Sequence, residues 1–109
     1  MLVYKVFRSP EWAEFEAAGT TLGAPVDLAD GFVHLSTAAQ LGGTLKKHFA
    51  GETGLVLLAV DPRTIGSDLR WEPSRGGDLF PHLYRPLEMA DVVWTCPIED
   101  GGVLPEGLT

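Results

Sequence analysis

Leu69–Leu87, LRWEPSRGGDLFPHLYRPL, is the stretch on which the organisation of this chain depends. Its prolines and the Gly76-Gly77 pair exclude an ordinary helix. A buried strand favours runs of aliphatic residues, and a plain solvent loop favours Ser, Asn and Gly. Interleaved cations, carboxylates and aromatics instead indicate a binding surface, the alternative being a long ordered loop held by its own arginines. The side chains concerned are Arg70, Trp71, Glu72, Arg75, Asp78, Phe80, His82, Tyr84 and Arg85.

Charge is unevenly distributed along the chain. The 109 residues, 45% of them hydrophobic, suffice for one domain with a single core. The net charge of −7 argues against general affinity for nucleic acid or an anionic membrane. Residues 70–86 nevertheless carry a net charge of +1, whereas the rest of the chain carries −8. This cationic patch on an acidic body predicts a small anionic molecule as partner, such as a nucleotide or phosphate ester.

The cysteine count and the length of the apolar runs bear on location. Cys96 is the single cysteine, so no internal disulfide can form and a reducing compartment is favoured. No apolar run approaches the ~18 residues that a membrane-spanning helix needs. We therefore expect a cytoplasmic protein without membrane attachment. The sequence sets no oligomeric state.

The segments around the central stretch predict an α+β fold. Leu55–Val60, LVLLAV, lacks polar alternation and predicts a central strand covered on both faces. Ser9-Pro10-Glu11 and the Thr37/Gln40 pair are typical of helix N-termini. We expect one compact domain over 1–109, with a mixed, mainly antiparallel, curved or split sheet, two main helices and a partly flexible tail over 98–109. The expected strands cover 2–7, 31–36, 55–60, 69–72, 82–84 and 92–96, the helices run over 9–18 and from 37 to a closing glycine at 51, and 20–30 is expected to be loop.

Alternation within the short strand 31–36 assigns its faces. Val33 and Leu35 share one face, which we expect to be buried, while Phe32, His34 and Ser36 share the other. We therefore predict that His34 and Ser36 face a concave site. His82 and Tyr84, from the central stretch, are expected to share that site.

Three motifs in this order resemble the small bacterial proteins of domain-of-unknown-function family 952. They are DGFVHLST at 30–37, LVLLAVD at 55–61 and RWEPSRGGDLFPHLYRPL at 70–87. The resemblance extends from Tyr4 to about Val93. That family is in turn distantly similar to the ADP-ribosyltransferase and RNA 2′-phosphotransferase fold. This similarity implies an ADP-ribosyltransferase-like split sheet that grips NAD or an ADP-ribosylated intermediate.

The resemblance also implies roles for individual residues. An enzyme of that kind needs groups that orient a ribose, an aromatic that stacks on the ligand and a carboxylate beside the reacting carbon. We expect His34, Glu72 and His82 to be catalytic and an NAD- or ADP-ribose-like ligand to be bound. The expected ligand-binding residues are Ser36, Arg70, Trp71, Arg75, Phe80 and Tyr84.

Two alternatives remain open at this stage. A non-catalytic module could bind the same small anion or nucleotide and act through a protein partner. A metal site built from His34, His82 and Glu72 has suitable ligand types, but it lacks a recognised ligand spacing and ranks below the nucleotide site.

Overall fold

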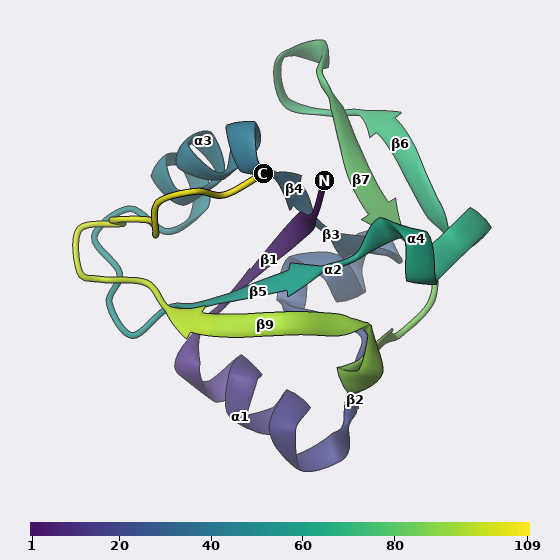
Figure 1. Cartoon of the computed structure of the whole chain (residues 1–109), viewed down its shortest axis with the longest axis horizontal. Helices are drawn as coiled ribbons and strands as arrows, with labels where there is room; N and C mark the ends of the chain where they lie inside the picture. The colour runs from purple at the N-terminus through teal and green to yellow at the C-terminus, as the bar shows by residue number, and fades with distance from the viewer.

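The structure is a computed structural model that describes residues 1–109, with the side chain of Arg75 outside the described part (Figure 1). It is an α+β domain, as the sequence predicts. The strands are β1 Val3–Phe7, β2 Thr20–Thr21, β3 Val33–His34, β4 Ser36–Thr37, β5 Val56–Val60, β6 Leu69–Pro73, β7 Leu79–Leu83, β8 Leu87–Glu88 and β9 Val92–Pro97. The helices are α1 Ser9–Ala18, α2 Pro25–Asp30, α3 Ala38–His48 and α4 Pro62–Ile65, with short 3-10 turns at Gly66–Asp68, Arg75–Gly77 and Met89–Asp91.

A four-stranded antiparallel sheet in the order β4-β1-β5-β9 forms the centre of the molecule. β5 lies inside this sheet, and its side chains enter two hydrophobic clusters alternately. Leu58 belongs to the cluster that contains Phe15 of α1, and Leu57 belongs to the cluster that contains Leu41 of α3. The two main helices therefore cover opposite faces of the sheet (Figure 1), and the prediction of a strand buried on both faces is confirmed.

A second antiparallel sheet in the order β3-β7-β6 carries most of the central stretch. The chain crosses from this sheet to the first at Leu35, which lies between β3 and β4. The backbone N–H of Leu35 donates to the carbonyl of Pro81 at 3.0 Å and so ties the crossing to β7. The β-structure is thus split into separate sheets. A third, two-stranded sheet pairs β2 with β8.

The ends of the two main helices follow local sequence signals. In α3 the expected capping box forms, because Thr37 Oγ1 accepts from the N–H of Gln40 at 3.3 Å while Gln40 Oε1 accepts from the N–H of Thr37 at 3.0 Å. The N-cap position of α1 is Arg8 rather than Ser9, and the backbone N–H of Arg8 donates to Oε1 of Glu11 at 2.9 Å. The hydroxyl of Ser9 donates instead to the carbonyl of Gly54 at 2.6 Å.

The prediction of loop over 20–30 is wrong. β2 and the six-residue helix α2 lie within this segment. Pro25 occupies the start of α2, and Asp27 accepts a hydrogen bond from the N–H of Ala24 at 2.7 Å, which closes the first turn. Gly31 ends the helix with a φ of 84°, in the left-handed region that favours glycine.

The C-terminal segment returns to the first strand. Ile98 is buried, and the N–H of Leu2 donates to the carbonyl of Thr109 at 3.0 Å, so the two termini lie together (Figure 1). A partly flexible tail stays a prediction. None of the described helices is both long and apolar enough to cross a membrane.

Candidate functional site

A cavity of about 650 Å³ lies beside β1, where β4 ends. β4 pairs only with Val3 and Tyr4, so the edge of β1 beyond Tyr4 faces the cavity instead of another strand on that side. The N-terminal turn of α2, the C-terminal part of α3 and strand β7 provide further walls. The cavity therefore lies at the split between the two larger sheets, and His34, Ser36 and His82 all line it.

His34 and His82 are direct neighbours across strands β3 and β7. They occupy opposed positions in the antiparallel register, and their ring centres lie 5.3 Å apart. Their flanking partners Val33 and Leu83 are also opposed and point into the core. The alternation predicted for strand 31–36 is confirmed, and the structure brings the two histidines together on one face.

His82 is held by Glu72 from the neighbouring strand β6, and Tyr84 in turn holds Glu72. Its Nδ1 lies 2.8 Å from Oε1 of Glu72, and the hydroxyl of Tyr84 donates to the same oxygen at 2.6 Å. The hydrogen bond from Tyr84, followed by the one from His82, lowers the pKa of Glu72, so this carboxyl is ionised near neutral pH. Glu72 therefore holds the imidazole from the side of Nδ1.

The other ring nitrogen of His82 is open. His82 is only 4% exposed, yet Nε2 makes no hydrogen bond to any described residue. No buried side-chain nitrogen or oxygen in the described part of the chain lacks a partner, so Nε2 must be reachable by solvent. Because His82 lines the cavity, Nε2 is presented to whatever occupies it.

His34 is held by a carboxylate from α2. Its Nδ1 lies 2.6 Å from Oδ1 of Asp27, and its Nε2 lies 3.0 Å from Oδ2 of Asp30. Asp27 is 1% exposed and also accepts from the ammonium of Lys5 at 2.6 Å. Burial by itself would raise the pKa of Asp27, but the hydrogen bond from His34 and the charge of Lys5 outweigh burial and lower it.

Aromatic rings close the site on the side away from the cavity. Phe32 stacks on His82 with ring centres 4.2 Å apart, and it also contacts the rings of His34 and Tyr84. The guanidinium of Arg70 lies 4.6 Å from the centre of the Tyr84 ring. Phe32 and Tyr84 line a second, smaller cavity of about 250 Å³.

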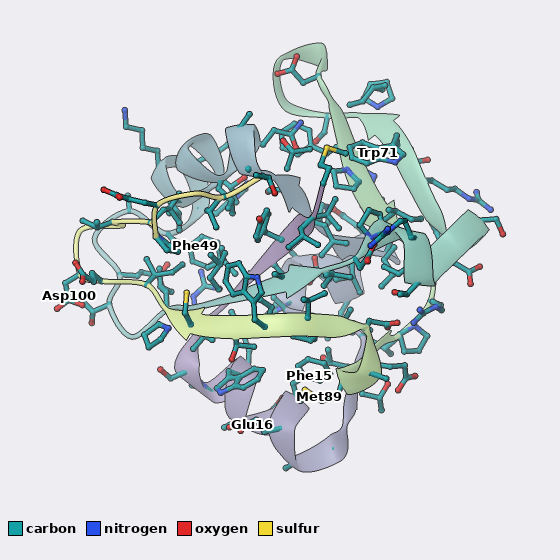
Figure 2. The ribbon with its side chains drawn as sticks, in the orientation of Figure 1. Phe15, Glu16, Phe49, Trp71, Met89 and Asp100 are labelled. Atoms are coloured by element: carbon teal, nitrogen blue, oxygen red, sulfur yellow. The ribbon has the colours of Figure 1, made fainter. Side chains whose placement is uncertain are left out.

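The remaining expected site residues are placed differently. Ser36 lines the main cavity and shares a hydrogen bond of 2.9 Å with the hydroxyl of Thr44, while Phe80 lines the same cavity. Trp71 pairs with Pro81, one position away from the register of His82, and lies on the other face of the sheet, where it is 39% exposed (Figure 2). The side chain of Arg75 lies outside the described residues, so its role stays a prediction.

Sequence reasoning missed Lys5, Asp27, Asp30 and Phe32 as members of the site. Two local signals could have found the first pair. Lys5 interrupts an otherwise apolar strand, and a buried lysine needs a buried acidic partner. Asp27 stands two residues after a proline in a helix-start pattern, which could have predicted α2. The pairing of Lys5 with Asp27 spans 22 residues, and no local pattern predicts it.

The described side chains that line the cavity carry more positive than negative charge. The cationic ones are Lys5, Arg8 and Lys47, and the acidic ones are Glu11 and Asp30. Lys47 forms no ion pair with any described residue, whereas Arg8 is paired with Glu11 and Glu52. Among the described side chains, no three His, Cys, Asp or Glu residues are arranged to hold a metal ion. The excess of cationic side chains on the cavity wall can pair with an anionic group.

Comparison with known proteins places the chain in a family. The X-ray structure of protein CC0527 from Caulobacter crescentus is 46% identical, with a TM-score of 0.89 over 97% of this chain and 94% of that one. The solution NMR structure of the same protein has a TM-score of 0.82 at 46% identity, over 96% and 91% of the two chains. No curated protein matches significantly. The model of the protein family of unknown function DUF952 matches residues 6–95, and the chain belongs to this family.

Proposed function

We propose that this chain binds a phosphorylated ribonucleotide of the NAD or ADP-ribose type in the cavity beside β1. The observation that carries the proposal is the arrangement of His82, a buried imidazole whose Nδ1 is held by Glu72 while its Nε2 opens into a cavity with cationic walls. An accessible ring nitrogen held in a fixed orientation can hydrogen-bond to a ligand that enters the cavity.

The size and charge of the cavity support this ligand class. A volume of about 650 Å³ is within the range of ordinary small-molecule sites. Lys47 is an unpaired cation among the described residues on its wall and suits a phosphate group. Phe49 and Phe80 also line the cavity and offer apolar surface to a base.

We also infer a distant similarity to the ADP-ribosyltransferase and RNA 2′-phosphotransferase fold, which implies the same ligands. Two features are compatible with this inference: the antiparallel β-structure splits at Leu35, and the cavity lies at the split. The lone thiol of Cys96 supports a cytoplasmic location, where such nucleotides are abundant.

Binding is tested by thermal unfolding and calorimetry with NAD, ADP-ribose, AMP and adenosine. A ligand present at about 100 times its dissociation constant stabilises the folded chain by about 2.7 kcal/mol. We expect stabilisation by the phosphorylated compounds and little by adenosine, since the phosphate supplies the charge complementarity. Equal effects of AMP and adenosine would contradict the proposal.

Two adjacent lysines of α3 provide a matched pair of variants. Lys47 lines the cavity, whereas Lys46 is exposed elsewhere on the same helix and carries the same charge. We expect Lys47→Gln to weaken binding of ADP-ribose by at least about tenfold, the equivalent of one charge-assisted hydrogen bond. Lys46→Gln should leave the affinity unchanged. Equal losses in both variants would indicate a diffuse charge effect rather than this site.

A further inference from the structure

The partners of His82 fix which of its ring nitrogens carries a proton. An ionised carboxylate can only accept hydrogen bonds, so Nδ1 must donate to Glu72 at 2.8 Å. In the neutral ring, Nε2 then carries the lone pair, and it faces the cavity. A lone pair held in this way is suited to take a proton from a reacting group.

His34 lies between two carboxylates. Oδ1 of Asp27 lies 2.6 Å from Nδ1 in a hydrogen bond, and Oδ2 of Asp30 lies 3.0 Å from Nε2 as a charge contact. In its imidazolium form, the ring carries one N–H at Nδ1 and another at Nε2. Asp30 is half-exposed at the end of α2, so its carboxylate can turn away and leave the Nε2 proton to a substrate oxygen.

We propose that His82 and His34 act as general base and general acid in the hydrolysis of a phosphodiester within a ribonucleotide, namely a ribonucleoside 2′,3′-cyclic phosphate. The proposal rests on the proposed function for its ligand site. The ring centres are 5.3 Å apart, so both rings can come within hydrogen-bond reach, about 3 Å, of oxygens on one phosphorus.

The position of the carboxylates favours reaction at phosphorus over reaction at a sugar carbon. Cleavage at an anomeric carbon is generally assisted by a carboxylate beside the developing positive charge. Asp27 and Glu72 lie behind the imidazoles and do not line the main cavity. Two other carboxylates line the cavity, but Glu11 is bound to Arg8 and Asp30 is paired with His34.

Lys5 can stabilise charge on the phosphoryl group. Its ammonium donates to Oδ2 of Asp27 at 2.6 Å and to the carbonyl of His34 at 3.1 Å, which leaves one of its three N–H groups for a ligand. Lys5 is 6% exposed and lines the cavity, so this donor is preorganised. Fixed donors directed at developing negative charge are a main source of catalysis.

The enclosure of the two histidines favours a cyclic ester. Phe32 stacks behind His82 at 4.2 Å, and Asp27 backs His34, so the substrate can approach the rings from the cavity side only. A linear diester between two nucleosides needs room on both sides of the phosphate. A cyclic ester keeps both ester oxygens on one ribose and leaves the base in the wider cavity.

In the proposed step, Nε2 of His82 takes a proton from a water molecule as its oxygen attacks phosphorus. A new P–O bond forms, one ring P–O bond breaks, and Nε2 of His34 gives its proton to the departing ribose oxygen. The product is a ribonucleoside monophosphate. Exchange of one proton with solvent restores both imidazoles, and no oxidation or reduction takes place.

The test is to incubate the full chain with each of the four ribonucleoside 2′,3′-cyclic phosphates and to follow ring opening by chromatography and phosphorus NMR. We expect conversion to the monophosphate, with one oxygen atom incorporated from isotopically labelled water. If none of the four compounds is opened, the proposal is overturned.

Two substitutions at the histidines identify the reacting groups. We expect His82→Gln and His34→Gln each to lower kcat by at least about a hundredfold, the usual contribution of general acid–base catalysis. Each variant loses one hydrogen bond to the ligand, so the affinity for the monophosphate product should fall by no more than about tenfold. Lys46→Gln, outside the cavity, is the control and should retain wild-type kcat. Turnover by His82→Gln within threefold of wild type would overturn the assignment.

The Glu72→Gln variant provides a second test of the role of His82 if the buried His82→Gln variant does not fold. Glu72 is a positioning residue: its carboxylate can only accept from Nδ1 of His82, whereas the amide of glutamine can also donate to Nδ1 and leave the ring proton on Nε2. We expect kcat to fall by at least about tenfold, while the affinity for the monophosphate product changes by less than about threefold. A kcat within threefold of wild type would exclude base catalysis by His82.

The outcomes separate this proposal from the one on which it rests. If ADP-ribose and AMP bind but no cyclic phosphate is opened, the site is a binding module and only the hydrolysis proposal fails. If neither compound binds and no ring opens, both proposals fail. Ring opening that depends on His34 and His82 supports both.

Discussion

The two histidine–carboxylate pairs of this molecule have the same geometry but different surroundings. Nδ1 of His34 lies 2.6 Å from Asp27, and Nδ1 of His82 lies 2.8 Å from Glu72. The side chain of Asp27 is completely buried, whereas that of Glu72 is 36% exposed. The His34–Asp27 pair is therefore part of the framework of the fold, whereas the His82–Glu72 pair orients an imidazole and contributes little to stability.

The framework role of Asp27 follows from the number of groups it joins. One carboxylate accepts from Lys5 on β1, from the N–H of Ala24 at the start of α2 and from both the backbone and the ring of His34 on β3. It therefore connects the four-stranded sheet, a helix and the three-stranded sheet. Glu72 joins only two side chains of its own sheet region.

The largest effect is expected for Asp27→Asn. The amide has no charge, and its NH2 group would face the donor atoms of either Lys5 or His34. Breaking a buried ion pair by removing one partner costs about 3–5 kcal/mol. We expect a loss of that size in the free energy of unfolding, measured by urea denaturation.

Asp30→Asn is the matched control for this substitution. Asp30 also faces His34, but its side chain is 48% exposed. A surface change of this kind should alter stability by less than about 0.5 kcal/mol. Similar losses for both aspartates would mean that the buried pair is not the framework we describe.

The next-largest effect is expected on the free energy of unfolding at acidic pH. The pKa of Asp27 is lowered in the folded chain, so its contribution to stability is present above its ordinary value of 3.8 and is lost as pH falls through the lower folded value. Wild type should therefore lose stability below about pH 4 more steeply than Asp27→Asn, measured by urea denaturation between pH 2.5 and 7. Parallel curves for the two proteins would show that another carboxylate dominates acid unfolding. Hydrogen bonds with Arg63 lower the pKa of Asp61 to about 2, and Arg85 lowers the pKa of Asp91. Both carboxyls titrate in wild type and in Asp27→Asn, so their contributions to stability cancel in the comparison.

A smaller loss is expected for Lys5→Met. Methionine keeps the apolar stem but removes the ammonium, while Asp27 retains three hydrogen bonds from Ala24 and His34. A hydrogen bond to a charged group is worth about 1.5–3 kcal/mol. We expect a loss of about 2 kcal/mol by urea denaturation. A loss as large as that of Asp27→Asn would make Lys5, rather than His34, the principal partner of the carboxylate.

The contrast between the two pairs also explains what the sequence could predict. The apolar run at Leu55–Val60, the capping box at Thr37 and the outward face of His34 depend on local periodicity, and the structure confirms each. The α+β class followed from such patterns, whereas the DUF952 family came from the resemblance of three longer motifs. Ligand class and chemistry stay proposals.

Long-range pairing limited the rest of the prediction. Asp27 was placed in a loop because its partners lie on β1 and β3, and the short α2 has too few residues for an apolar stripe. The assignment of Trp71 to the ligand neglects strand alternation. Glu72 lies on the same face of the sheet as Phe80, so its neighbour Trp71 lies on the opposite face.

The smallest effect on stability is expected for Glu72→Gln. Glu72 is bound by His82 and Tyr84 at the surface, and the carbonyl oxygen of glutamine can still accept from either group. Exposed ion pairs contribute little to stability because water and salt screen them. The melting temperature at pH 7 should therefore change by less than about 3 °C, measured by circular dichroism in low and in high salt. A large drop would make Glu72 a framework residue like Asp27, and the two pairs would then differ only in exposure. An unchanged melting temperature, together with the lowered kcat expected for the same variant, would instead separate the orientation of His82 from the stability of the fold.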